Sequence, residues 1–221
     1  MKHNQMRQVV FPILAAFIWG TSFVSQDICA DSMGAFTFNG TRYFIAVLSL
    51  LVVIAVMNTT RKDRPQPTAE EKKASRKQLW LGGLCCGTAL AVASNFQQAG
   101  LVAGTDAGKA GFITALYVVL VPLLGVFFGR RPGVKLGICA CISLAGLYLL
   151  CLAGHDTLTL TGGEWMLLLC SLLFAFQIML VDHYSPRLDG VQLSFAEFFA
   201  TAVLSTIFMF VFETPTFAQI Q

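Results

Sequence analysis

The stretch GTDAGKAGFITALYVVLVPLLGVFFGRR, residues 104–131, decides the fold class. It opens with Thr105 or Asp106 as a helix N-cap, continues through about twenty apolar residues and stops at two arginines, which is typical of a membrane-spanning helix. Small residues crowd its first turns around Lys109, and Pro122 inside the apolar run predicts a kink. Close packing at one end and a bend near the other predict a helix that lines a cavity.

The whole chain has the composition of an integral membrane protein. Of its 221 residues, 56% are hydrophobic and 12% are charged, and the mean hydropathy is +0.69. The apolar share is above that of ordinary soluble domains and the charged share is below it. The net charge is +3, and the basic residues are distributed among short segments between apolar runs. This distribution argues against nucleic acid as a partner, so the partner we expect besides a small-molecule substrate is the lipid bilayer.

Seven apolar segments predict seven transmembrane helices, at 9–25, 35–57, 79–100, 107–128, 134–153, 163–181 and 191–212. Each is long enough to cross roughly 30 Å of hydrocarbon. The period-two alternation of β-barrel strands is absent from the sequence. The fold class we expect is therefore all-α, a polytopic transmembrane helix bundle.

Lysine and arginine fall on alternate sides of these segments. They occupy the N-terminus, the 59–77 linker and the loops after the fourth and sixth segments, whereas the loops at 27–34, 101–106 and 154–162 contain neither. The positive-inside rule then predicts a multi-pass protein of the plasma (inner) membrane with a cytoplasmic N-terminus. A seven-helix receptor has the opposite polarity. The 59–77 linker is expected to be solvated rather than a domain.

Small residues at four-residue spacing predict close helix packing in three segments. They are Ala16 and Gly20; Gly83, Gly87 and Ala91; and Gly133, Gly137, Cys141 and Ala145. The seven cysteines show no CxxC or Cys/His spacing, so we expect apolar packing and neither metal nor cofactor. The sequence also holds no Walker motif or nucleophile elbow, and the histidines lie at span ends or in tails, so we expect neither ATP-driven transport nor an enzyme.

The chain aligns weakly with itself at an offset of 155 residues, where Trp19 falls on Phe174 and Arg42 on Glu197. A repeat with an odd number of helices begins again upside down in the membrane. We therefore expect residues 1–155 to form a first five-helix repeat and 156–221 to begin a second, inverted repeat that is truncated after two helices. A homodimer or further C-terminal helices would then complete the bundle.

Several motifs closely resemble EamA-type permeases of the drug/metabolite transporter superfamily. They are FIWGTSFVSQ (17–26), FTFNGTRYFIAVLSLL (36–51), NFQQAGL (95–101), TDAGKAGFITALYVVLVPLLG (105–125), GLYLLCL (146–152) and FAFQIMLVDHYSPRLDGVQLSF (174–195). The resemblance implies ten helices in two inverted five-helix repeats, a cavity near the membrane midplane, and movement of small metabolites or drugs, often as efflux. Three helices of that pattern are missing here.

Three ionisable side chains inside the apolar segments each need a reason, because charge is costly in lipid. Arg42 either snorkels outward or pairs with Asp31 or Asp106, or it binds an anionic substrate group. Lys109, beside a helix N-terminus, either binds such a group or reaches outer water. Glu197 either carries a proton or cation for coupling or forms a salt bridge with a neighbouring helix.

Neutral polar and aromatic side chains complete the candidate cavity lining, because unpaired amides in lipid must face protein or water. They are Trp19, Ser22, Asn95, Gln97, Gln98, Thr114, Tyr117 and Gln177.

The function we predict is secondary-active transport of a small organic solute, by a permease or exporter that works through alternating access. The alternatives are a non-transporting membrane scaffold or receptor-like protein, and an inactive fragment of a permease.

Overall fold

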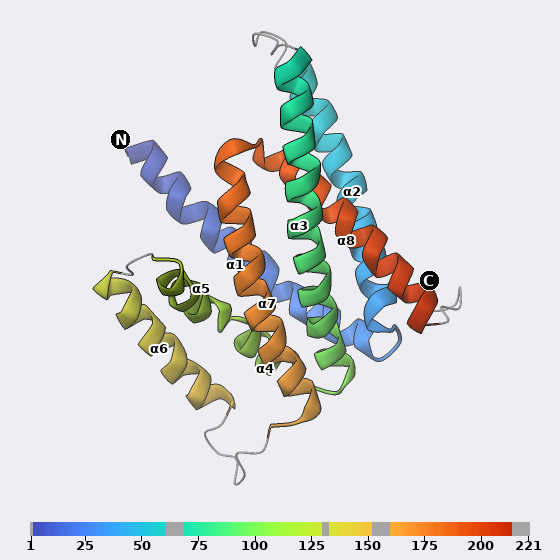
Figure 1. Ribbon diagram of the computed structural model, residues 1–221. Coiled ribbons are helices and arrows are strands. Elements are labelled where there is room, and N and C mark those ends of the chain that lie inside the picture. The colour runs from blue at the N-terminus through green and yellow to red at the C-terminus, as the bar shows by residue number, and fades with distance from the viewer. Residues whose placement is uncertain (1, 61–68, 130–132, 152–159, 214–221) are drawn as a thin grey trace.

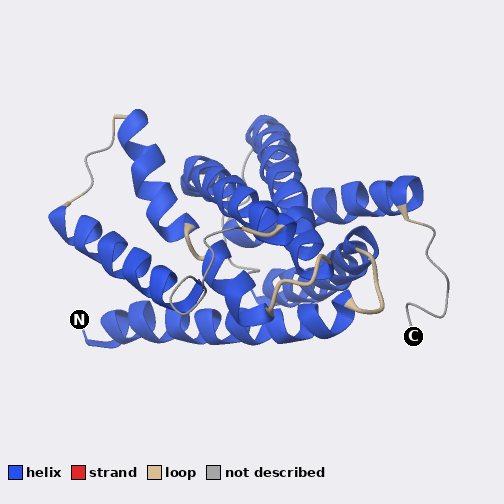
Figure 2. Ribbon diagram, turned by 90° about the horizontal axis from the view of Figure 1, so that it is seen from below, coloured by secondary structure: helices blue, strands red, loops and turns tan. Residues whose placement is uncertain are grey.

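The computed structural model describes residues 2–60, 69–129, 133–151 and 160–213, and helices account for nearly all of them (Figure 1). The helices are α1 (Lys2–Ala30), α2 (Ala35–Thr60), α3 (Ala69–Val102), α4 (Ala107–Thr114), α5 (Tyr117–Phe127), α6 (Val134–Cys151), α7 (Gly162–Tyr184) and α8 (Gly190–Phe212), with a 3₁₀ turn at Ser185–Arg187. Figure 2 shows the same bundle from its lower end, with helices joined by short loops and no strand in the described ranges.

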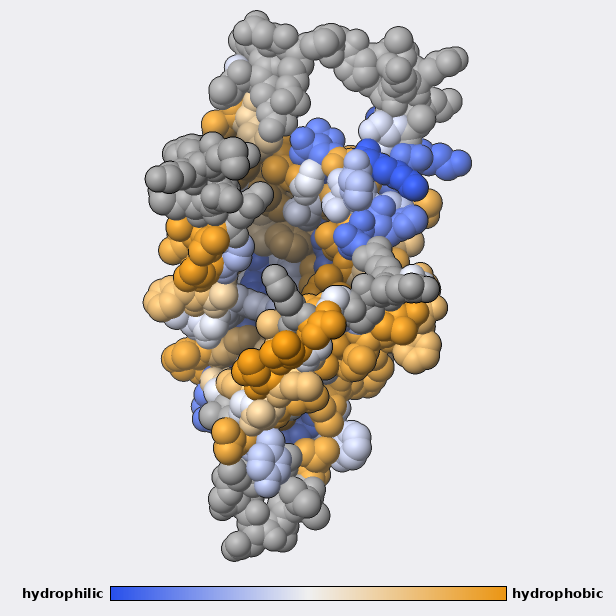
Figure 3. Space-filling view, turned by 90° about the vertical axis from the view of Figure 1, so that its left-hand side faces the viewer, coloured by the Kyte–Doolittle hydropathy of each residue, from blue (hydrophilic) through white to orange (hydrophobic). Residues whose placement is uncertain are grey.

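Six of the predicted spans are long and apolar enough in the described chain to cross a membrane, with α4 and α5 together counted as one. The expected span at 134–153 corresponds to α6, whose described apolar stretch, Leu136–Gly146, is shorter. Large apolar side chains are exposed along the bundle, with Phe127 86% exposed, and they form much of the face seen in Figure 3 between its hydrophilic upper part and its lower end. Such a surface suits lipid rather than water. The prediction of an all-α polytopic bundle is confirmed.

The fourth span is broken, but not where Pro122 predicts. Its helix stops at Thr114 and resumes at Tyr117, whereas Pro122 lies inside the continuous helix α5. At the break the backbone changes from four-residue to three-residue hydrogen bonds, as Leu116 N donates to Ile113 O and Val118 N to Ala115 O. These tighter bonds satisfy the backbone through the break. Asp106, rather than Thr105, is the N-cap of α4.

The 59–77 segment, predicted to be a solvated linker rather than a domain, is helical at both of its ends. Helix α2 continues to Thr60, and α3 already begins at Ala69. The first two turns of α3 consist mostly of charged and polar residues. Residues 61–68 lie outside the described ranges. Long helices continue past the bilayer because charged residues such as lysine and glutamate are good helix formers in water.

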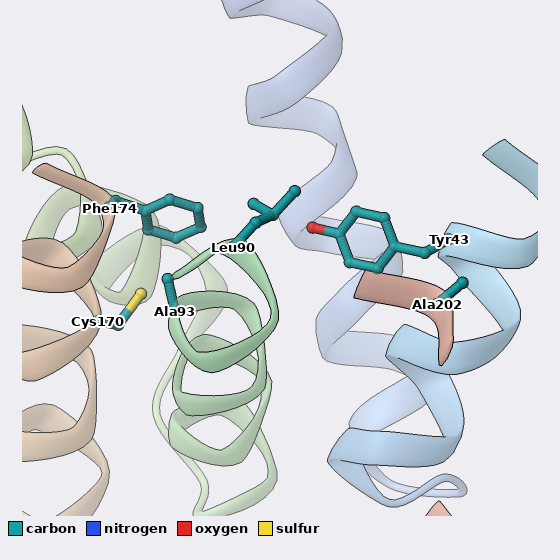
Figure 4. Close-up of a cluster of buried hydrophobic side chains, with 6 residues drawn as sticks. All are labelled: Tyr43, Leu90, Ala93, Cys170, Phe174 and Ala202. Atoms are coloured by element: carbon teal, nitrogen blue, oxygen red, sulfur yellow. The ribbon is translucent and has the colours of Figure 1, made fainter. Parts of the chain in front are cut away.

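Helix α3 lies at the centre of the bundle and packs against α7 and α8, while α2 packs along α8 (Figure 1). Figure 4 shows one buried cluster of side chains from these four helices. Its members are Tyr43 of α2, Leu90 and Ala93 of α3, Cys170 and Phe174 of α7, and Ala202 of α8. Helix α3 also contacts α1 and α4, so it borders most of the helices that form the candidate site.

The small-residue pattern predicts packing correctly in α3 only. A Cβ added to Gly83 would collide with Ala196, and one added to Gly87 would collide with Glu197 O, both on α8. Gly20 of α1 and Gly137 of α6, by contrast, have open space around them. The cysteines divide in the same way, since Cys86 and Cys170 are buried and Cys139 and Cys141 are exposed on α6.

We predict that Gly87→Ala destabilises the protein by about 1–3 kcal/mol, because the new methyl group forces α3 away from the α8 backbone. Gly137→Ala is the matched control, since it adds the same methyl group to a helix position with open space. Thermal unfolding of both variants in detergent, followed by fluorescence, measures the difference. Equal melting temperatures would contradict the close contact.

Candidate functional site

Four rings from three helices form the first part of the site, here called the aromatic cluster: Trp19 and Phe23 of α1, Tyr117 of α5 and Phe174 of α7. The Trp19 ring centroid lies 5.5 Å from that of Tyr117, 6.2 Å from Phe23 and 6.3 Å from Phe174. These distances are typical of favourable tilted and edge-on ring pairs. Trp19 is 37% exposed, so part of its ring surface is accessible within the described chain.

The second part of the site is a carboxylate with an amide partner. Gln177 Nε2 of α7 donates a hydrogen bond of 2.5 Å to Glu197 Oε1 of α8. Glu197 is 5% exposed. Gln177 follows Phe174 by three residues, so both project from the same face of α7. The amide that holds the carboxylate therefore lies about one helical turn along α7 from the Phe174 ring of the aromatic cluster.

Backbone contact between α3 and α8 fixes the position of Glu197. The single hydroxyl proton of Thr201 is shared between two carbonyl acceptors, with Oγ1 2.9 Å from Glu197 O and 3.0 Å from Gly87 O. This hydroxyl bridges the two helices at the point where α8 lies too close to residue 87 for that residue to carry a side chain. Within the described ranges, the side-chain partner of Glu197 on a neighbouring helix is the neutral amide of Gln177 and not a cation.

The predicted amides near the end of α3 connect it to α1 and α4. Gln98 Nε2 donates to Gln26 O at 3.0 Å, and Gln97 Nε2 lies 3.4 Å from Thr114 Oγ1. Gln26 Nε2 in turn contacts Ser22 O and Ser22 Oγ. The contacts of Gln97, Gln98 and Thr114 therefore join helices to one another, whereas those of Ser22 lie within α1.

Asn95 belongs to a different, structural network. Asn39 Nδ2 of α2 donates to Asn95 Oδ1 at 3.0 Å and to Ser94 O at 2.9 Å. Asn95 Nδ2 donates to Ser205 Oγ of α8 at 3.1 Å. Both asparagines are buried. One side chain of α3 therefore joins α2 to α8, which favours helix association over substrate contact for Asn95.

Arg42 does not pair with Asp31 or Asp106, and the expectation of an acidic partner was wrong for the described chain. Its guanidinium lies 5.4 Å from the Phe38 ring centroid and 4.8 Å from the Tyr43 ring centroid. Its Nη2 also donates to Tyr43 Oη at 3.2 Å. Aromatic faces attract a guanidinium electrostatically, so two rings of its own helix stabilise Arg42.

Lys109 forms an ion pair with Glu164 of α7. Glu164 is buried and also accepts a hydrogen bond from Thr161 N, while Thr161 Oγ1 accepts from Glu164 N, which is a capping box at the start of α7. The lysine charge is therefore already neutralised. A substrate anion would have to displace a carboxylate that Lys109 and the Thr161 N–H hold in place.

Several residues that form contacts between helices were missed by the sequence analysis: Gln26, Asn39, Glu164, Ser205 and Glu213, whose carboxylate accepts hydrogen bonds from Phe36 N and Thr37 N of α2. A signal existed for Glu164, because Thr161 followed three residues later by a glutamate predicts a capping box. Gln26 and Asn39 lie inside the quoted motifs. Glu213 carried no sequence signal, since its partners are 176 and 177 residues away.

The long apolar spans, the buried polar contacts between them and the apolar exterior define a multi-pass α-helical membrane protein. The EamA-like transporter family model matches residues 6–152, and the chain belongs to that family. It is also 32% identical over 205 residues to an uncharacterized transporter of Archaeoglobus fulgidus, covering 92% of this chain and 58% of that protein. The chain thus spans under two thirds of this relative. No solved structure matches it.

We predict that Asn95→Ala lowers the free energy of unfolding by about 1–3 kcal/mol, because it leaves two buried partners without one of their hydrogen bonds. Ser49→Ala is the control, since the Ser49 hydroxyl is exposed and bonds only Ile45 O of its own helix. Thermal unfolding in detergent compares the two. If Asn95→Ala unfolds at the same temperature as the parent, the hydrogen bonds of Asn95 do not stabilise the bundle, and Asn95 becomes a candidate for substrate contact again.

Proposed function

We propose that this protein is a secondary-active transporter that carries a small organic solute across the plasma membrane by alternating access. Membership of the EamA-like transporter family and the six long apolar helices support a transport role. Because the chain covers 58% of its relative, the proposal applies to the assembled transporter, whether a homodimer or further helices complete it.

The observation that carries the proposal is the buried Glu197 carboxylate, whose partner Gln177 lies one helical turn from Phe174 of the aromatic cluster. Aromatic rings offer apolar surface and attract organic cations, and a carboxylate nearby supplies the opposite charge. Trp19, Tyr117 and Gln177 then contact the solute, with Thr114 beside them. This arrangement suits a small aromatic or cationic molecule. It includes no set of groups for bond cleavage, and we expect no enzymatic reaction.

Glu197 is our candidate for the coupling group. An ionised carboxylate inside a membrane is costly unless it is paired, and its partner here is a neutral amide. The side chain of glutamine can donate to a carboxylate and accept from a carboxylic acid. Glu197 can therefore keep Gln177 as its partner in both protonation states, as a proton carrier must.

The helix arrangement supports alternating access. The self-alignment equates the segment at 35–57 with that at 191–212, and the corresponding helices α2 and α8 pack along each other. In inverted-repeat transporters the two equivalent elements meet around the substrate site and move against each other. The contact between α2 and α8 is where such movement would occur.

We predict that reconstituted parent protein takes up ethidium, an aromatic organic cation, when a proton gradient is imposed across the vesicle membrane. Glu197→Gln should reduce gradient-driven uptake at least about tenfold, because the amide cannot carry a proton. Trp19→Ala should weaken uptake by loss of ring contact, and Ser49→Ala should behave as the parent. If Glu197→Gln leaves uptake unchanged, Glu197 is not the coupling group. If the parent protein shows no uptake at all, the alternative of a non-transporting membrane scaffold is favoured.

The orientation makes a separate prediction. In a cysteine-free background, Lys77→Cys should be protected from a membrane-impermeant maleimide in intact cells and labelled after lysis, because the basic segment faces the cytoplasm. Ala103→Cys should be labelled in intact cells. Both positions are exposed, so the contrast reports only the side of the membrane. The reverse pattern would contradict the proposed orientation.

A further inference from the structure

The end of α8 holds the beginning of α2 through one carboxylate. Glu213, the C-cap residue of α8, accepts hydrogen bonds from Phe36 N at 2.9 Å, Thr37 N at 2.8 Å and Thr37 Oγ1 at 2.6 Å. The two N–H groups belong to the first turn of α2, where no partner exists within the helix itself. The positive end of the helix dipole adds to the attraction. We name this contact the Glu213 clasp.

The residues next to the Glu213 clasp pack closely around it. A Cβ at Gly34 would collide with the Glu213 carboxylate, so the absence of a side chain there lets the carboxylate approach. The Phe36 ring stacks on that of Phe212 with centroids 5.7 Å apart and planes 25° apart, and it also contacts Phe208 at 5.7 Å. Rings and clasp together close the α2–α8 seam at this end.

A cavity lies directly beside this closure. An apolar groove of about 320 Å³ runs between α2, α3, α7 and α8, lined by Ala35, Phe36 and Phe212 and, further along, by Asn95. The clasp residues and the groove share the first turn of α2 and the last turn of α8. Separating these two helix ends would therefore widen the groove at the clasp.

We propose that the Glu213 clasp is a releasable latch, which keeps this end of α2 and α8 together in one conformation and opens in another. Glu213 is only half-buried, so water can replace its three donors when the helices part. That suits a contact which must form and break, unlike the buried Asn39–Asn95–Ser205 network deeper in the same seam. The purpose of opening rests on the proposed transport function, but the latch itself does not.

The latch is tested by cysteine accessibility in detergent, where membrane orientation plays no part. The seven native cysteines are replaced, and a reporter Ala35→Cys is introduced at a position that is 8% exposed beside the clasp. Its rate of labelling by a maleimide is measured with Glu213 intact and in Glu213→Ala. A second reporter, Ala107→Cys at the start of α4, monitors general loosening. Asp106→Asn is the matched variant, because the Asp106 carboxylate caps only its own helix.

Glu213→Ala should raise the labelling rate at position 35 about tenfold or more, since three hydrogen bonds to a charged acceptor are lost, and leave that at position 107 unchanged. Asp106→Asn should leave position 35 at the parental rate. An unchanged rate at position 35, or an equal rise at both reporters, overturns the latch. A selective rise in a protein that shows no flux would retain the latch while the proposed function fails.

Discussion

The structure depends on the close approach of α3 and α8. Glycine at positions 83 and 87 brings the backbones together, and the Thr201 hydroxyl bonds both of them at the point of contact. In lipid no hydrophobic effect drives two helices together, so such contacts and a few interhelical hydrogen bonds must supply the association. Because Glu197 belongs to the α8 backbone at this contact, the same approach places the carboxylate.

The remaining helices assemble around this pair. α2 is joined to α3 and α8 by the asparagine network, and α7 packs against α3 and presents Phe174 and Gln177 from one face. α1 and α5 then contribute Trp19 and Tyr117 to the aromatic cluster. The break between α4 and α5 makes Tyr117 the first residue of a new helix. A site shared by α1, α5, α7 and α8 is the kind that helix movement would alter.

Hydropathy predicted the spans well, because apolar length is a local property of the sequence. The sequence also named Trp19, Tyr117, Gln177 and Glu197, but not that the first two touch or that the last two bond. Of the alternatives for Arg42, the acidic partner is not seen in the described chain, where two rings of its own helix face the guanidinium, a contact that the sequence analysis did not consider. Small-residue spacing occurs in α1, α3 and α6, yet among the described residues only the α3 glycines lie in close contact with another helix, because such contact depends on tertiary arrangement.

Three glutamates at helix contacts show why one of them is the best coupling candidate. Glu164 has a lysine and lies in a capping box, and Glu213 has the N–H groups of a helix end, so each has positive charge or dipole as compensation. Glu197 has only an amide within the described chain and is almost fully buried. Its ionised form is therefore the least compensated of the three. A group that gains most from taking up a proton or a cation, at a contact between helices, has the properties that coupling requires.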